Sequence, residues 1–157
     1  MIAWLGVLLA MAAAAATIMI RPLGAATTEY LVVDPHTGLA IDGFDPVAYY
    51  TEGAALQGRE IIEYSFAGAV WRFRNEGNRA AFAADPEVYM PQYGGYDPVD
   101  IARGAAVAGN PREWLVWGTR LFLFHSPEAR EAFSADRDQI MEAAHAQWPS
   151  IQRKLSP

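Results

Sequence analysis

The chain begins with an uninterrupted apolar run. Residues 2–20, IAWLGVLLAMAAAAATIMI, contain no charged residue, and Arg21 and Pro22 follow them directly. At a rise of 1.5 Å per residue, about 20 apolar residues cross the hydrocarbon core of a bilayer. A secretory hydrophobic region is shorter, about 7–15 residues, and follows a basic segment that is absent here. The pattern favours an N-terminal transmembrane helix, with a cleaved signal near residues 24–28 as the alternative.

Both interpretations direct the chain to a membrane. Residues 1–26 are predicted to be a membrane anchor or signal segment, and residues 27–39 a linker. Arg21 is a mild indication that its flank is cytoplasmic. Because this is a single charge, we nevertheless expect the folded part to lie outside the cytoplasm, as in a periplasm. In the cleaved alternative the domain would be secreted.

Apolar and polar residues alternate in two later segments. Residues 60–66 place Ile62, Tyr64 and Phe66 on one face, and an Ala-Gly pair then leads into residues 69–74. Alternation with a short Gly-containing turn is typical of a β-hairpin. Residues 113–124 predict a second hairpin, which turns at Gly118-Thr119. The tryptophans after the apolar run are interpreted as core residues: Trp71, Trp114, Trp117 and Trp148.

Helix signals flank both hairpins. Asp45 is a candidate N-cap with Pro46 at the first helical position and Gly53 as a stop. Residues 78–90 predict a helix that breaks or restarts at Asp85-Pro86. A short helix is predicted in residues 97–104, and a longer one in residues 126–148 with Ser126 as its cap.

The same order of motifs occurs twice. GFDPV at residues 43–47 recurs as GYDPV at residues 95–99, and residues 71–86 align with 122–137 at nearly the same offset. Matched blocks at one offset indicate a duplicated supersecondary unit. We therefore predict an α+β fold of two pseudo-repeated units, each a short helix, a β-hairpin and a helix. The predicted boundaries are 43–93 and 95–149 for the units, 40–149 for the single domain and 150–157 for a tail.

Charge and composition exclude several functions. The chain has 12 basic and 18 acidic residues, and without Arg21 of the apolar segment the balance is 11 − 18 = −7. An acidic domain with scattered basic residues lacks the electrostatic footprint of a nucleic-acid-binding protein. The chain contains no cysteine. Disulfides, zinc-thiolate sites and cysteine nucleophiles are therefore excluded.

Four motifs together resemble the YHS domain family in its exported, tandem form: GFDPVAYY, WRF, AAFAADPEVY and PQYGGY. The resemblance covers residues 40–149. The triad behind the family's name is matched by Phe124, His125 and Ser126, with Phe in place of Tyr. Short YHS domains are related to cysteine-bearing metal-binding modules that occur beside heavy-metal transport. The resemblance therefore implies a binding module that is an accessory in metal homeostasis.

The resemblance also implies three positions in each unit where relatives carry metal-binding cysteines. In the first unit these positions hold Ala48, Arg74 and Asn78. In the second unit they hold Asp100, His125 and Ala129. Arg74 would repel a cation, so a metal site is not expected in the first unit. Asp100 and His125 remain as ligands for a divalent transition metal such as Zn(II), Cu(II) or Ni(II). No other cofactor is predicted.

Each candidate group also has a purely structural interpretation. For His125 we favour the structural interpretation, in which a histidine at a strand end is hydrogen-bonded to the backbone at the start of the next helix, because two ligands do not make a tight metal site. His145 would be a third ligand only if the fold returns it to His125, and His36 is expected in a solvated turn. Asp45 and Asp97 form a pair that could perform acid–base chemistry, but caps that bond an orphan amide, for about 1 kcal/mol, explain both.

No catalytic residues are predicted, and we do not expect an enzyme. His125-Ser126 lacks the opposed geometry of a nucleophile and its base, and no G-x-S-x-G elbow is present. An enzyme with a small-molecule cleft near residues 93–97 is the weakest of three hypotheses. The second is a non-metal interaction or structural module with an aromatic-lined seam, and the first is the metal-homeostasis module.

Aromatic residues concentrate near the predicted boundary between the units: Phe44, Tyr49, Tyr50, Tyr89, Tyr93 and Tyr96. One interpretation is a ligand or partner cleft, lined by Tyr49, Tyr93, Tyr96, Gln92 and Arg103. The other, which we favour, is that the rings fill the seam and donate their hydroxyls to loop backbone.

Overall fold

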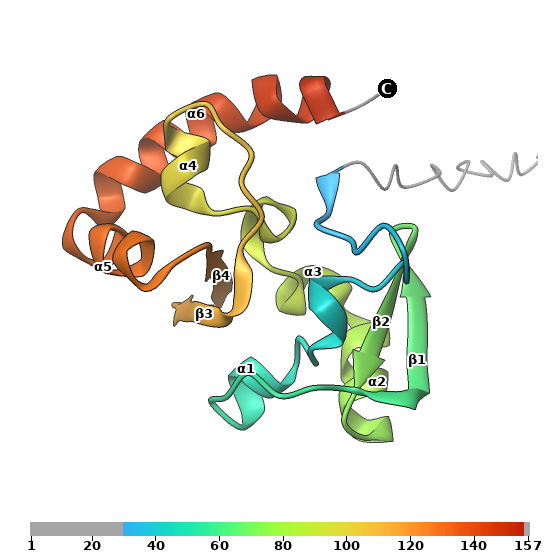
Figure 1. Ribbon diagram of the computed structural model, residues 1–157. Helices are drawn as coiled ribbons and strands as arrows, with labels where there is room; N and C mark the ends of the chain where they lie inside the picture. The colour runs from blue at the N-terminus through green and yellow to red at the C-terminus, as the bar shows by residue number, and fades with distance from the viewer. Residues whose placement is uncertain (1–29, 156–157) are drawn as a thin grey trace, which may run out of the picture.

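The computed structural model describes residues 30–155, which form an α+β fold with two antiparallel hairpins and six α-helices (Figure 1). The predicted α+β class is confirmed. The predicted anchor in residues 2–20 lies outside the described residues. Within residues 30–155, no helix has both the length and the apolar character needed to span a bilayer.

The first hairpin joins β1 (Arg59–Phe66) to β2 (Ala69–Phe73), as predicted. Its turn residues, Ala67 and Gly68, have φ values of 52° and 73°. Two central residues with positive φ match the right-handed twist of the flanking strands, which makes this turn type favourable in hairpins. Trp71 and Phe73 are buried on one face of β2, whereas Arg72 lies between them on the half-buried face.

The second hairpin joins β3 (Asn110–Trp117) to β4 (Arg120–Phe124). After Arg120, every residue of β4 is buried. Leu121 and Leu123 belong to one hydrophobic cluster, and Phe122 and Phe124 to the other. Because successive side chains of a strand point to opposite faces, β4 packs against both clusters at once.

The described helices differ in length: α1 (Ala48–Thr51), α2 (Glu76–Ala84), α3 (Pro86–Tyr89), α4 (Pro98–Ala102), α5 (Pro127–Ala135) and α6 (Arg137–Leu155). The predicted break at Asp85-Pro86 is confirmed by the division between α2 and α3. The prediction of one helix over residues 126–148 is wrong, because Asp136 leaves the helical conformation (φ −138°, ψ 47°) and separates α5 from α6.

Both ends of the described chain contribute more to the fold than predicted. Helix α6 continues past residue 149, and Ile151 is buried, so residues 150–155 are not a tail. At the other end, the predicted linker packs against the first hairpin. The Val70 amide donates to Gly38 (2.9 Å), and the Ala40 amide donates to Val70 (2.9 Å).

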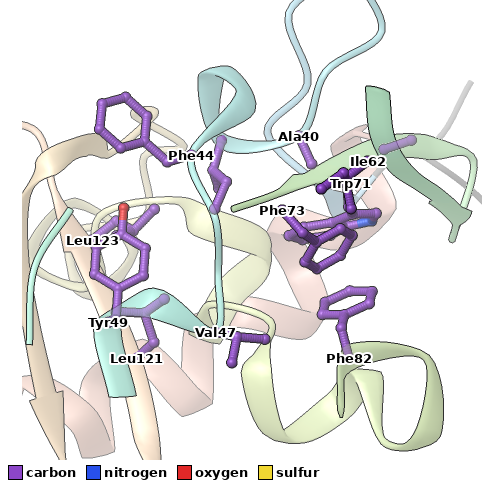
Figure 2. Packing of buried hydrophobic residues seen from close by; sticks show 12 residues of the cluster. Ala40, Phe44, Val47, Tyr49, Ile62, Trp71, Phe73, Phe82, Leu121 and Leu123 are labelled. Atoms are coloured by element: carbon purple, nitrogen blue, oxygen red, sulfur yellow. The ribbon is translucent and has the colours of Figure 1, made fainter. Parts of the chain in front are cut away.

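Equivalent ring stacks hold each hairpin to the helix that follows it. Phe82 of α2 contacts Trp71 and Phe73, with ring centroids 4.8 and 5.3 Å apart. Figure 2 shows these three rings together. In the second stack, Phe133 of α5 contacts Phe122 and Phe124 of β4 at 5.0 and 5.2 Å: the same arrangement, 51 residues further along the chain.

A turn with left-handed backbone precedes each Asp-Pro step. The 3₁₀ helix η2 (Ile41–Gly43) has positive φ at all three residues, and η3 (Gln92–Gly95) has positive φ at Tyr93, Gly94 and Gly95. Gly94 must be a glycine, since an added Cβ would lie 1.5 Å from the carbonyl oxygen of Tyr30. The two turns place the two Asp-Pro steps in similar surroundings.

The four tryptophans do not share one environment. Trp71 is buried, and Trp114 and Trp148 are half-buried. The prediction of a core role is wrong for Trp117, which is 49% exposed at the end of β3. The guanidinium of Arg137 lies 3.4 Å from the centroid of its indole ring, which is a cation–π arrangement at the surface.

Substitution of Leu121 tests the role of β4 in joining the two clusters. Leu121→Ala removes a fully buried side chain and is expected to lower the free energy of unfolding by about 2–5 kcal/mol. Val70→Ala is the matched control, because Val70 has the corresponding place in β2 but is only half-buried, and its cost is expected to stay below about 1.5 kcal/mol. Urea denaturation measures both, and equal losses would contradict the account.

Candidate metal centre

The candidate site is built around the fully buried carboxylate of Asp97. Asp97 precedes Pro98 and caps α4, since its Oδ1 accepts the Val99 amide at 2.8 Å. Its Oδ2 accepts the backbone amide of His125 at 2.8 Å. The predicted cap is confirmed, and the same side chain also ties the start of α4 to the end of β4.

Asp45 makes the matching contacts in the first hairpin region. Its Oδ1 accepts the amides of Val47 (2.8 Å) and Ala48 (3.3 Å). Its Oδ2 accepts the Arg74 amide (2.8 Å) and the Asn78 side-chain amide (2.7 Å). Helix α1 begins only at Ala48, with Val47 as its flanking residue. Asp45 therefore binds the amides at the helix start, as predicted, but the helix begins two residues later than Pro46.

The second half satisfies its buried carboxylate differently. The position of Asn78 is held by Ala129, which has no hydrogen-bonding side chain. His125, at the position of Arg74, supplies the missing contact, and its Nδ1 lies 2.8 Å from Asp97 Oδ2. An imidazole thus replaces the carboxamide that binds Asp45.

Asp100 adds a second carboxylate to the same imidazole nitrogen. Its Oδ2 lies 2.8 Å from His125 Nδ1, the same distance as Asp97 Oδ2. Only the contact with Asp97 has hydrogen-bond geometry, and within residues 30–155 the buried Asp100 Oδ2 has no hydrogen-bond donor. A buried carboxylate oxygen without a donor is costly, so Asp100 Oδ2 is the unsatisfied atom of this arrangement.

These three side chains lie close enough together to hold one cation. One ligand atom from each of Asp97, Asp100 and His125 lies within 4.8 Å of the others. The structure therefore brings together the two predicted ligands. Asp97 was missed as a third, because its capping role accounts for the residue in the sequence. Asp97 is identified as a ligand by its position next to His125. The equivalent contact of Asp45 with residue 74 indicates the same position.

The other histidines lie elsewhere. The exposed ring of His145, on α6, is hydrogen-bonded through Nδ1 to the Tyr93 hydroxyl and is not part of the cluster. His36 is exposed in a turn, as predicted, and its amide donates to Asp34.

A small movement of His125 would open its two carboxylate contacts to the spacing of zinc ligands. Ligand atoms bonded tetrahedrally to zinc at about 2.0–2.1 Å lie about 3.3 Å apart, so each 2.8 Å contact would open by about 0.5 Å. The His125 side chain is 40% exposed, whereas Asp97 is fully buried and Asp100 is 14% exposed. The imidazole is the ligand with room to move. Its Nδ1 would lose a proton on coordination, since a metal ligand must be deprotonated.

The residues predicted for a cleft do not converge on one site. Gln92 and Tyr93 border a small hollow with His145 and Trp148, and Tyr96 packs against Trp148. Tyr49 lies in the other cluster, where its ring contacts Trp114. Figure 2 shows Tyr49 beside Leu121 and Leu123. Arg103 is on the far end of α4, beside Asp100.

The seam tyrosines serve packing. The hydroxyl of Tyr49 donates to Pro111 O (2.8 Å), and that of Tyr50 donates to Val88 O (3.0 Å). Burial raises the pKa of Tyr93 to about 12, and burial also raises the pKa of Tyr49. The backbone hydrogen bonds of Tyr49 and Tyr50 agree with the interpretation that these rings fill the seam, whereas the Tyr93 hydroxyl is bonded to the side chain of His145.

An apolar hollow lies apart from the carboxylate cluster. It has a volume of about 430 Å³ and is bordered by Leu31, Phe66, Met90, Pro91 and Trp148, among others. Neither Asp97, Asp100 nor His125 lines it. The ion-binding geometry and the apolar hollow are therefore independent features.

Comparison of the chain with models of known protein families, with curated proteins and with solved structures finds no match.

Buried Tyr93 predicts a loss of stability at alkaline pH. An unfolded tyrosine loses its proton near pH 10, but folded Tyr93 holds it to about pH 12, so the stability present below pH 10 declines as pH rises through this window. Urea unfolding at about pH 9 and about pH 11 should show a decline that is smaller by roughly 1 kcal/mol in Tyr93→Phe. An identical decline in the variant would show that Tyr93 titrates normally.

Proposed function

We propose that this protein is a metal-binding module that holds one divalent transition-metal ion through Asp97 Oδ2, Asp100 Oδ2 and His125 Nδ1. One observation carries the proposal: a single imidazole nitrogen lies 2.8 Å from two carboxylate oxygens, and one of these is buried without a hydrogen-bond donor. One proton on Nδ1 can be directed at only one oxygen, whereas a cation interacts with both.

Comparison of the two buried carboxylates argues against a purely structural role for the cluster. In the first half, Asn78 completes the hydrogen bonds of Asp45, and the position of Asp100 holds Ala48. Asp97 is satisfied by the Val99 amide and by the amide and Nδ1 of His125, without Asp100. A second carboxylate against the same nitrogen adds like charge beside a buried anion, and this is unfavourable unless a cation joins them.

The donor set indicates the class of metal. One imidazole and two carboxylates are borderline and hard ligands, which suit Zn(II), Ni(II) and Cu(II). The cluster has no thiolate or thioether, the ligands that select Cu(I). This chemistry supports a role as an accessory in the homeostasis of a divalent metal.

The two halves are proposed to be diverged copies of one YHS-like unit. The support is the recurrence of motifs 51–52 residues apart. In addition, Asp45 and Asp97 each accept the backbone amide at the end of the hairpin that follows them. In this proposal the second copy keeps metal ligands where relatives carry cysteines, at Asp100 and His125. The first copy has lost them.

The apolar sequence of residues 2–20 supports a membrane location. We propose that it anchors the domain to a membrane with the folded part outside the cytoplasm. Cleavage and secretion are the alternative, and the two differ in whether the mature protein retains these residues.

The alternative function, a partner-binding aromatic seam without metal, has weaker support. Of its six aromatic residues, three are buried and three half-buried, and the hydroxyls of Tyr49 and Tyr50 bind backbone within the domain. These rings already make contacts within the domain, which leaves less of their surface for a partner. No group in the cluster is assigned a catalytic role.

Calorimetric titration of the full-length chain in detergent with Zn(II), Ni(II) and Cu(II) tests the proposal. We expect one ion per chain. His125→Ala and Asp100→Asn each remove a ligand and should weaken binding by about a hundredfold or more, because even changes to groups that only orient ligands cost about 10–100-fold. His36→Ala is the matched control, since His36 is exposed and remote from the cluster, and should bind as the wild type does. Unchanged heat in His125→Ala would contradict the proposal.

A further substitution leaves all three ligands in place. Ala129→Asn supplies the carboxamide that binds Asp45 Oδ2 in the first half. It should compete with His125 for Asp97 Oδ2 and weaken metal binding by about tenfold, roughly the worth of one charge-assisted hydrogen bond. Circular dichroism should show an unchanged fold. Undiminished affinity in Ala129→Asn would mean that the matched contacts do not govern the site.

A further inference from the structure

The cluster leaves an ion incompletely coordinated. In the part of the chain that the structure describes, the three residues that can hold a metal together are Asp97, Asp100 and His125. Zinc sites with three protein ligands keep a fourth position for water or an added ligand, in contrast to closed structural sites. The half-exposed His125 ring places one side of the cluster at the surface.

We propose that this open position takes a small carboxylate, held jointly by the ion and by Arg103. The inference rests on the proposed metal site. It assigns to that site a metal-dependent anion as its second ligand.

Arg103 is positioned beside the cluster by the end of α4. It follows the last helical residue, and its guanidinium Nη1 lies 3.9 Å from Asp100 Oδ1. The other oxygen of that carboxylate, Oδ2, faces His125. The Asp100 carboxylate therefore has the candidate ion position at one oxygen and a guanidinium at the other. The Arg103 side chain is 70% exposed, so its remaining donors are accessible from solvent.

A divalent ion changes the charge around the cluster by two units. Asp97 and Asp100 contribute two negative charges and Arg103 one positive charge, so the sum is −1 with a neutral His125 and +1 after an ion adds two. Glu128 adds one further negative charge at the start of α5, where its own backbone amide and the Ser126 hydroxyl hold its pKa below the ordinary range, so the totals that include it are −2 and 0. The metal-free protein therefore repels an anion, whereas in the metal-loaded protein this net repulsion is absent and the ion and Arg103 attract the anion locally.

A carboxylate fits this pair of partners better than a spherical anion does. Its two oxygens lie on one planar group, so one oxygen can bind the ion while the other accepts from the guanidinium. Arginine presents donors in a planar fork that matches carboxylate geometry, and charge-assisted hydrogen bonds of this kind are stronger than neutral ones. Arg103 was a predicted polar contact for a tyrosine-lined cleft. The structure places it at the carboxylate cluster instead.

The test uses the full-length chain in detergent, loaded with Co(II) as a spectroscopic substitute for Zn(II), and titrated with acetate. We expect a saturable change in the visible Co(II) absorption of the wild type. Arg103→Gln should bind Co(II) at least as tightly, because a neighbouring positive charge has been removed, but should weaken acetate binding by about tenfold. Arg79→Gln is the matched control, since Arg79 makes the same i,i+3 ion pair on α2, and should respond to acetate as the wild type does.

The outcomes separate the two proposals. Absence of Co(II) binding would overturn the metal centre itself. Co(II) binding without an acetate response, or with the same response in Arg103→Gln, would overturn the co-ligand and leave the metal centre standing. A saturable response to inorganic phosphate but not to acetate would overturn the assignment of a carboxylate. Loss of the acetate response in Arg103→Gln alone supports the inference.

Discussion

The structure depends on two buried aspartate carboxylates, Asp45 and Asp97, each of which must be fully hydrogen-bonded. Each binds the amides that begin a short helix and the amide at the end of a hairpin. A buried charge is tolerated only when such donors surround it, so the helix start and the strand end cannot separate without exposing it. In the second half, the same contacts bring the side chain of Asp100, three residues after Asp97, close to that of His125 at the strand end.

This constraint explains why the candidate ligands converge in the second half and not in the first. Beside Asp45 the adjoining positions hold Ala48 and Arg74, and Asn78 completes the hydrogen bonds. Beside Asp97 they hold Asp100 and His125, and a nitrogen that serves the buried carboxylate also faces a second one. In both halves the fold brings the helix start and the strand end to one buried aspartate. The two halves differ in the side chains at these positions, and only those of the second half can bind a metal. Since Asp97, like Asp45, accepts backbone amides from both sides without a metal, the contact between helix start and strand end does not depend on the ion. The proposed ion would then bind to a domain that is already folded, and folding would not require it. This accords with an open coordination position.

Sequence patterns predicted the elements that have a local signal. Alternation and turn residues predicted both hairpins, and Pro86 predicted the break after α2. The equivalent break at Asp136 was missed because Arg137 follows it, and no proline disrupts the helical pattern there. Trp117 is a large aromatic residue in an apolar segment, which is typical of a core residue. Its exposure could not be predicted, because it depends on the end of β3 and on its position relative to α6. Asp100 and His125 were predicted from the family resemblance, whereas Asp97 required the three-dimensional clamp, because one carboxylate serves both a cap and a candidate ligand set.

The most direct test of the account is the position of the ion. Crystals of the full-length chain grown with Zn(II), with diffraction recorded across the zinc absorption edge, would locate it independently of any variant. The account predicts one anomalous peak, bonded to Asp97 Oδ2, Asp100 Oδ2 and His125 Nδ1, with the imidazole shifted away from both carboxylates. A peak elsewhere, or a protein that remains free of zinc with Nδ1 still hydrogen-bonded to Asp97, would contradict it.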